Sequence, residues 1–161
     1  MDMATVSTSM PLVAGLGLRA TASVDSLHAL WLQACTWFIQ QPGWPSSTSP
    51  FCTTVAVLTH KAQHPALLAW QAQLPFATRL VAVPPERLAA QAVHTQSPRL
   101  LALYGTGSVA EATALAAAGP GARLWLPRLV APDGCATLAL ACAAPPFDFV
   151  SGGAMASPLE E

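Results

Sequence analysis

Charged side chains are scarce in this sequence, and two of its cations stand where ligands are often bound. Seven of the 161 residues are lysine or arginine, and Lys61 is the only lysine. Arg19 follows a predicted strand at 11–15, and Lys61 follows a second predicted strand at 53–58. Open α/β sheets bind ligands beyond the carboxyl ends of their strands. Arg19 and Lys61 are therefore candidates for binding an anion, and the alternative for each is a solvated surface residue.

Two glycine pairs are predicted to form turns between a strand and a helix. They are Gly15-Leu16-Gly17 and Gly105-Thr106-Gly107-Ser108. Backbone N–H groups at the start of a helix bind phosphate or carboxylate oxygens. Neither pair belongs to a G-x-G-x-x-G or G-x-x-x-x-G-K motif, so the sequence has no nucleotide fingerprint. Because tight turns need glycine anyway, each pair is either an anion-binding turn or an ordinary one.

Glu111 and His60 are the candidates for acid–base chemistry. Ser108 and Glu111 have the S-x-x-E spacing of a capping box, in which each side chain bonds to the backbone at the helix start. The capping box accounts for Glu111 without catalysis, and a general base is the alternative. His60 adjoins Lys61 at a predicted strand end. The four cysteines and four histidines lack the spacing of a metal site, so we expect neither metal nor cofactor.

The composition excludes several classes of protein. Hydrophobic residues make up 53% of the chain and charged residues 9%, with a formal charge of −1. This balance excludes a basic surface for nucleic acid or for a membrane. The longest apolar helical stretch, 27–39, is shorter than the roughly 20 residues of a bilayer span, and residues 1–10 lack the features of a secretory signal. We expect a cytoplasmic protein, and its high apolar content favours a homo-oligomer.

Apolar segments alternate with helical patterns along the chain, which is typical of an α/β fold. Strands or extended segments are expected at 11–15, 53–58, 79–83, 99–104, 123–126 and 136–141, the last two as a pair. Helices are expected at 24–38 after the N-cap Ser23, at 65–73 and at 109–118, with a helical turn from 84. We predict one three-layer domain over 11–142, with a mostly parallel central sheet flanked by helices. Flexible segments are expected at 1–10 and 143–161.

Several motifs, taken in order, resemble the CobE family, which is the C-terminal domain of CbiG as a free-standing protein of cobalamin biosynthesis. The resemblance runs from about Leu12 to Ala141. It is carried by V-A-G-L-G-L-R at 13–19 with Ser23, Thr59 with Lys61, G-T-G-S-V-A-E-A at 105–112, L-P-R at 126–128 and A-T-L-A-L-A at 136–141. The family often has lysine where Arg128 stands. The length favours the free-standing type over full-length CbiG.

The resemblance implies a role in corrin-ring assembly. Corrin precursors have acetate and propionate carboxylates around an apolar macrocycle. The residues that the resemblance implies for binding are Gly15, Gly17, Arg19, Ser23, Thr59, Lys61, Gly105, Thr106, Gly107, Ser108 and Arg128. The three cations would each pair with a carboxylate, and the glycine turns would bind others. We expect these groups to converge at one end of the sheet and to form a shallow tetrapyrrole-binding face.

Three functions remain open at this point. The first, which we favour, is a protein that binds a precorrin or corrinoid intermediate without turnover. The second is an enzyme with Glu111 or His60 as acid–base and Lys61 as electrostatic stabiliser. It would be either a hydrolase that opens a precorrin lactone and releases acetaldehyde, as in full-length CbiG, or a mutase-like catalyst of the same pathway. The third is an α/β domain that binds a small phosphate or nucleotide. The family implies other enzymes of the cobalamin pathway, such as a methyltransferase, as partners.

Overall fold

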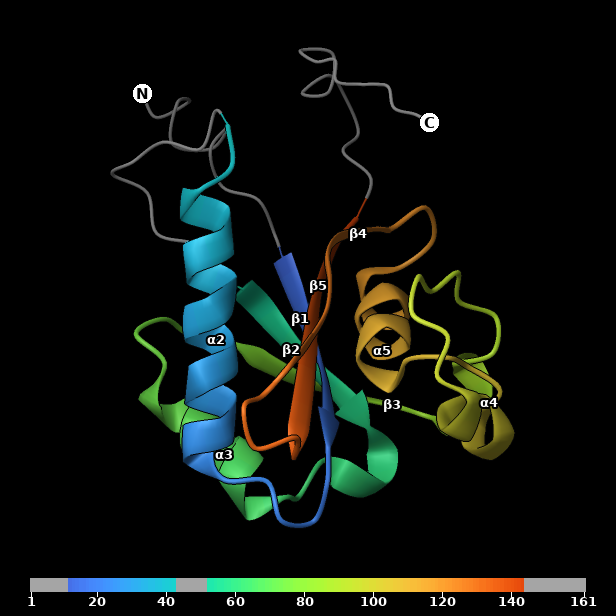
Figure 1. Cartoon of the computed structure of the whole chain (residues 1–161), viewed down its shortest axis with the longest axis horizontal. Helices are drawn as coiled ribbons and strands as arrows, with labels where there is room; N and C mark the ends of the chain where they lie inside the picture. Colours follow the sequence, from blue (N-terminus) through green and yellow to red (C-terminus); the bar gives the residue numbers. More distant parts are fainter. Residues whose placement is uncertain (1–11, 43–51, 144–161) are drawn as a thin grey trace.

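A computed structural model describes residues 12–42 and 52–143, which are arranged around one central sheet (Figure 1). The strands are β1 (Leu12–Leu18), β2 (Cys52–Leu58), β3 (Arg79–Val83), β4 (Arg123–Val130) and β5 (Ala136–Cys142). The helices are α2 (Val24–Ile39), α3 (Pro65–Gln73), α4 (Pro98–Tyr104) and α5 (Val109–Ala118), with short 3-10 turns η1 (Thr59–Lys61) and η2 (Pro85–Arg87). The segments predicted to be flexible, 1–10 and 143–161, lie outside the described residues except for Ala143.

The sheet has the strand order β3-β2-β1-β5-β4. β1 pairs with β2 and β2 with β3 in parallel, whereas β5 is antiparallel to both β1 and β4. Within this sheet, β5 therefore runs against the direction that the other strands share. The α/β fold with a mostly parallel sheet is confirmed. Because of this common direction, the carboxyl ends of β1, β2 and β4 meet at one edge of the sheet.

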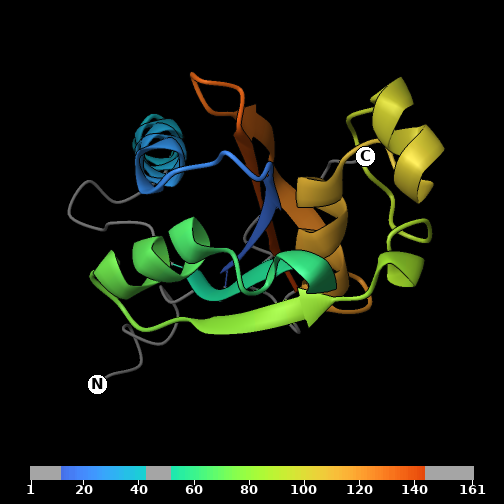
Figure 2. The same ribbon diagram turned by 90° about the horizontal axis from the view of Figure 1, so that it is seen from below.

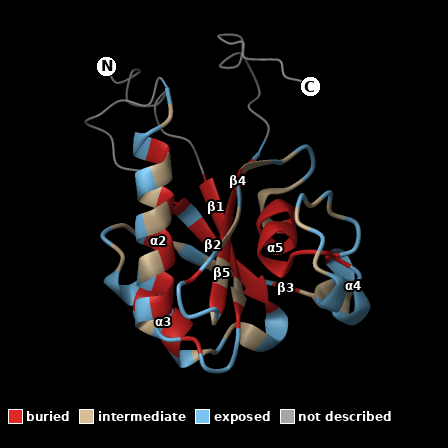
Figure 3. Cartoon of the chain, viewed as in Figure 1, coloured by how far each residue is buried: buried red, intermediate tan, exposed pale blue. Residues whose placement is uncertain are grey.

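Helices cover both faces of the sheet, which gives the three layers that the sequence predicts (Figures 1 and 2). On one face, α2 and α3 bury Leu27, Leu30, Trp31, Ala34, Phe38, Leu67 and Trp70. On the other face lies α5, which is buried over most of its length (Figure 3). Its small alanine side chains let this helix approach β1 and β5 closely.

Gly15 and Gly17 lie inside β1, so the predicted turn at these residues is wrong. They pair with Ala139 and Thr137 of β5. A Cβ on Gly15 would lie 2.1 Å from the carbonyl oxygen of Ala110 in α5, and one on Gly17 would lie 2.5 Å from the Thr137 hydroxyl. The glycines are thus required by close packing rather than by a turn. Their backbone groups belong to the sheet, which leaves no anion-binding turn here.

Residues 98–104 form α4 instead of the predicted strand or extended segment. The hydroxyl of Ser97 accepts a hydrogen bond from the N–H of Leu100, and Pro98 occupies the first turn. Gly105 ends the helix in the left-handed conformation, with φ of 73°. These local start and stop signals outweigh the β-like apolar run. The loop 105–108 therefore connects two helices rather than a strand and a helix.

The lengths of the described helices bear on membrane insertion. Among these residues, no single helix is long and apolar enough to cross a membrane. α4 and α5 meet the criterion only as a pair, joined across a 54° bend. α5 is a core helix packed on the sheet.

Candidate functional site

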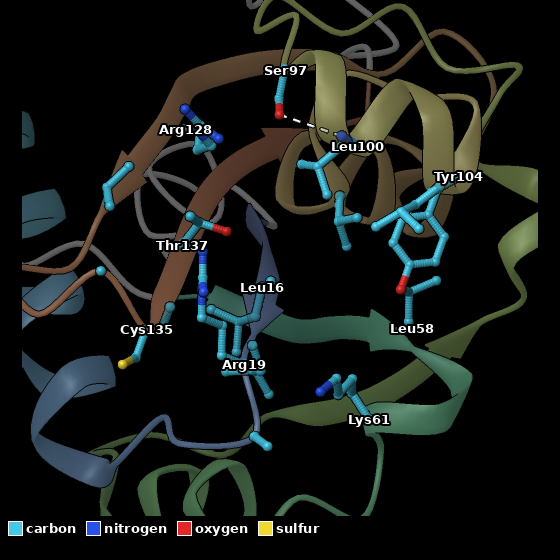
Figure 4. A pocket seen from close by; sticks show the side chains of 18 of the residues that line it. Leu16, Arg19, Leu58, Lys61, Ser97, Leu100, Tyr104, Arg128, Cys135 and Thr137 are labelled. Carbon is cyan, nitrogen blue, oxygen red and sulfur yellow. Dashed lines mark hydrogen bonds between the residues drawn. The ribbon is translucent and has the colours of Figure 1, made fainter.

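A pocket of about 720 Å³ lies at the edge of the sheet where β1, β2 and β4 end (Figure 4). Its lining comes from the ends of these strands, from the start of β5, from η1 and from one side of α4. Parallel α/β sheets bind their ligands at this edge, and the volume is in the usual range for small-molecule sites of about 300–1,000 Å³. The pocket is therefore the candidate binding site.

Cations dominate the charge of this pocket. Arg19 follows β1, Lys61 ends η1, Arg99 lies on α4 and Arg128 lies on β4, and all of them line the cavity. Lys61 and Arg128 are half-buried, whereas Arg19 and Arg99 are exposed. None of the described lining residues is acidic. The pocket consequently has a positive potential that attracts carboxylate or phosphate groups.

Much of the remaining wall is apolar. The sheet contributes Leu16, Leu18, Leu58 and Val130, and the helices contribute Leu100, Leu103, Tyr104 and Val109. The side chains of Leu103 and Val130 are 59% and 46% exposed. A ligand that covers these side chains and pairs with the surrounding cations has to be amphipathic.

The backbone of Arg19 is held on both sides. Its N–H donates to the carbonyl of Cys135 at 2.9 Å, and its own carbonyl lies 3.0 Å from Nε2 of His64. Nδ1 of His64 accepts from the N–H of Ala66 at 3.2 Å and caps α3. An imidazole nitrogen that accepts carries no proton, so Nε2 is the protonated nitrogen and donates to Arg19. His64 thereby links the start of α3 to a residue of the pocket.

Glu111 is fully buried in α5, and both of its carboxylate oxygens are bound. Oε1 accepts from the N–H groups of His94 and Thr95 at 2.7 and 2.9 Å. Oε2 accepts from the Thr95 hydroxyl at 2.7 Å and from the N–H of Arg128 at 2.9 Å. Burial raises the pKa of Glu111, but the bonds from Arg128, Thr95 and His94 together outweigh burial and hold the pKa below its usual range.

This geometry corrects the capping-box interpretation of Glu111. The hydroxyl of Ser108 does accept from the N–H of Glu111, at 3.1 Å, as the motif predicts. The carboxylate, however, bonds to the segment 94–95 and to β4, and the N–H of Ser108 donates to Thr106 at 3.5 Å. Glu111 does not line the pocket. Its position favours a structural role over the general-base alternative, because a base must reach the substrate.

The loop 105–108 borders the pocket without lining it. Tyr104 and Val109, which flank the loop, are lining residues. The N–H of Gly105 donates to the carbonyl of Leu101 at 3.0 Å, and the carbonyl of Gly107 accepts from Ser97 at 3.0 Å. The N–H of Gly105 is therefore used by α4. An anion-binding role for the rest of this loop stays a prediction, and its residues are not part of the pocket lining.

The remaining predicted residues divide between the pocket and its surroundings. Gly17 lines the pocket, and Gly15 does not. Thr59 lies between the lining residues Leu58 and His60 but is not itself part of the lining. Ser23 starts α2, where it bonds to Ser26. Its role there is that of an N-cap, as its position before the helix predicts.

Three pocket residues are not among those predicted from the sequence: Arg99, Tyr104 and Cys135. The first two depend on α4, whose signal was present in Ser97 and Pro98 and in the glycine that ends the helix. Cys135 lies in the turn before β5, and its sulfur is 3.3 Å from the Thr21 hydroxyl.

The four cysteines are free thiols: Cys35, Cys52, Cys135 and Cys142. Burial raises the pKa of Cys52 to about 12 and also raises the pKa of Cys35 and Cys142. In 12–42 and 52–143, no three His, Cys, Asp or Glu side chains are grouped as a metal site requires.

Comparison with known families agrees with the motifs and the fold. Residues 12–141 match the family described as Cobalamin synthesis G C-terminus. The chain belongs to this family. The match covers the sheet, the helices and the pocket, and it confirms the resemblance to CobE and the C-terminal domain of CbiG. A search of curated proteins gives no match.

Solved structures of this family have the same fold. One is CobE, a protein from the cobalamin (vitamin B12) biosynthetic pathway, at 26% identity and a TM-score of 0.64, over 81% of this chain and 92% of that one. Another is the cobalamin biosynthesis protein chiG from Agrobacterium tumefaciens str. C58, at 30% identity and a TM-score of 0.58, over 83% and 99%. A cobalamin biosynthesis protein G homologue from Sulfolobus solfataricus, at 16% identity and a TM-score of 0.53, shares the fold over 82% of this chain and 36% of its own.

Proposed function

We propose that this protein binds a carboxylate-rich precorrin or corrinoid intermediate in the pocket beyond the ends of β1, β2 and β4. The observation that carries the proposal is the position of Arg19, Lys61, Arg99 and Arg128 around one partly apolar cavity without an acidic lining residue among those described. Membership of the Cobalamin synthesis G C-terminus family supports this class of ligand.

The chemistry of the ligand matches the distribution of charge. A corrin precursor is an apolar macrocycle whose rim carries several carboxylates, and a site for it needs separated cations around an apolar wall. Lysine and arginine form charge-assisted hydrogen bonds to carboxylates, and arginine pairs with them through two parallel bonds. Lys61 and Arg128 are half-buried, so their ion pairs are screened less by water than those of an exposed residue.

The structure weakens the case for a phosphate or nucleotide ligand. That interpretation depended on the glycine turns as cradles of N–H groups. Gly15 and Gly17 are instead part of β1, and the residues of the loop 105–108 do not line the pocket. The cations remain, and they favour a ligand with several separated anionic groups over one with a compact phosphate chain.

A precorrin lactone hydrolase is the second candidate, and the position of His60 is the observation that favours it. His60 is exposed and lines the pocket beside Lys61. In such a reaction His60 would take a proton from water, and Lys61 would stabilise the negative charge on the lactone oxygen. We rank binding without turnover above it because Glu111, the other acid–base candidate, is buried outside the pocket.

The binding proposal is tested by titrating the purified protein with hydrogenobyrinic acid and following the visible absorption. The proposal predicts saturable one-to-one binding with no spectral conversion. Incubation with a lactone-containing precursor and an assay for released acetaldehyde tests the hydrolase. Release of aldehyde that His60→Asn abolishes would replace the proposal with the second candidate, and the absence of any binding would contradict the proposal.

A further inference from the structure

α4 differs from the other helices of the described chain in how little of it is buried. Its seven residues, Pro98–Tyr104, include no buried one. Leu101 and Leu103 are 42% and 59% exposed. Single exposed leucines are common on protein surfaces, but here two of them share a short helix that forms one wall of the pocket.

The base of this helix is nevertheless well fixed. The N–H of Ser97 donates to the carbonyl of Gly107 at 3.0 Å, which joins the two ends of the segment that carries α4. A Cβ on Gly107 would lie 2.1 Å from the carbonyl of Thr95, so the backbone segments before and after α4 are in close contact. Thr95 in turn is bonded to the buried carboxylate of Glu111. The ends of the segment are anchored, and Leu100 and Tyr104 pack against the buried cluster that includes Leu58 and Val109. Leu101 and Leu103 stay exposed.

The side chains of α4 fall into two sets. Arg99, Leu100, Leu103 and Tyr104 line the pocket, whereas Leu101 does not. Figure 4 shows Leu100 and Tyr104 on one side of the cavity and Cys135 on the other. One helix therefore offers an apolar surface and a cation to the same ligand, facing the cations at the strand ends.

We propose that α4 is the wall that binds the face of the macrocycle and sets the preference for a carboxylated ring over a small anion. Leu103 and Tyr104 pack against the apolar ring, and Arg99 pairs with a carboxylate on its rim. This inference rests on the proposed function. The occupant follows from charge complementarity, because the cavity combines apolar side chains with Arg19, Lys61, Arg99 and Arg128 and has no acidic lining residue among those described.

Leu101 provides a matched control for Leu103, because both are exposed leucines on the same helix and only Leu103 lines the pocket. The measurement is the dissociation constant for hydrogenobyrinic acid. Loss of a leucine side chain from a ring contact weakens binding by about three- to tenfold, from the apolar area left in water. We expect this loss for Leu103→Ala and less than about a twofold change for Leu101→Ala. Arg99→Gln weakens binding by about two- to fivefold, as for an exposed ion pair.

Hydrogen exchange gives a second readout. Binding of hydrogenobyrinic acid is expected to slow exchange of the backbone amides in 98–104, because none of the residues of α4 is buried without a ligand. Exchange in residues 32–39 of α2, which lie on the other face of the sheet and do not line the pocket, should not change. Equal affinities of Leu103→Ala and Leu101→Ala, or no slowing in 98–104, would overturn the inference about α4.

Failure of this inference can be told apart from failure of the proposed function. If Lys61→Gln weakens binding while Leu103→Ala does not, the pocket binds the ligand and α4 is not its wall. If the wild-type protein binds no corrinoid at all, both proposals fall together.

Discussion

The backbone N–H of Arg128 donates a hydrogen bond of 2.9 Å to the buried carboxylate of Glu111. Arg128 lines the pocket, and Glu111 lies behind it in α5. The same carboxylate binds His94 and Thr95, which precede the segment that carries α4. One side chain thus holds two walls of the pocket in place. Glu111 belongs to the G-T-G-S-V-A-E-A motif. Its hydrogen bonds explain the glutamate in this motif as a structural residue, without a catalytic role.

Replacement of Glu111 by glutamine should lower the free energy of unfolding by about 2–4 kcal/mol, because a buried network that loses one charged acceptor leaves donors unpaired. The amide NH₂ group of glutamine would face an N–H or hydroxyl donor that, in the wild type, bonds to a carboxylate oxygen of Glu111. Urea unfolding at pH 7 measures the change. Glu86→Gln is the control, since Glu86 is exposed on η2. Equal stability of the two variants would show that the network contributes little.

The stabilising effect of Glu111 should disappear in acid. Its pKa is lowered in the folded protein, so the carboxylate contributes stability above the unfolded pKa, which is about 4.3 for glutamate. That contribution is lost as the pH falls from this value through the folded pKa. The difference in unfolding free energy between the wild type and Glu111→Gln should therefore be full near neutral pH and shrink below about pH 4.3. A difference that grows on acidification would contradict the assigned network.

His64 should affect ligand binding through Arg19. Asparagine is a good N-cap, so His64→Asn should keep the start of α3 while losing the bond to the Arg19 carbonyl. Loss of one hydrogen bond that positions Arg19 predicts about a two- to tenfold weaker affinity for hydrogenobyrinic acid. In an Arg19→Ala background the same change should have no further effect, since the side chain that it positions is gone. Additive losses in the double variant would mean that His64 acts by another route.

The close packing of α5 on β1 can be tested with two glycine substitutions. In Gly15→Ala the new Cβ meets the backbone of Ala110 at 2.1 Å and that of Ala114 at 2.5 Å, so the helix has to move. We expect a loss of at least about 2–3 kcal/mol, the upper range for overpacking. Gly134→Ala meets no atom within 4 Å and costs only its left-handed φ of 73°, about 1–2 kcal/mol. Thermal denaturation ranks the two, and a milder effect at Gly15 would contradict this packing.

Local signals explain which elements could be predicted from the sequence. α5 has the predicted bounds because its two ends are marked by residues adjacent to it in the sequence, Ser108 and Gly119. α3 and β3 also have the predicted bounds, with Pro65 marking the start of α3. The glycines of β1 could not be interpreted in this way. The reason for Gly15 is a contact with α5, which lies far along the chain and is decided only by the tertiary fold.

The candidate site was predictable to the extent that it follows strand ends. Arg19 comes directly after β1, and Lys61 ends the η1 turn that follows β2. The topology of an α/β sheet gathers ligand-binding residues at such strand ends. Arg128 needed the family resemblance, because nothing local distinguishes an arginine within β4. Arg99 was missed because seven apolar-rich residues fit a strand or a helix equally well by periodicity, and the capping signals decided for the helix.

The most direct test of the account is the affinity of Lys61→Gln for hydrogenobyrinic acid, measured beside Arg79→Gln. Lys61 is a half-buried cation of the pocket, and Arg79 is an exposed cation on β3 that does not line it. Both variants remove one positive charge, so the effect of net charge is the same. We expect about a tenfold loss of affinity for Lys61→Gln, from one charge-assisted hydrogen bond, and little change for Arg79→Gln. Equal affinities of the two variants would contradict the assignment of the pocket as the corrinoid-binding site.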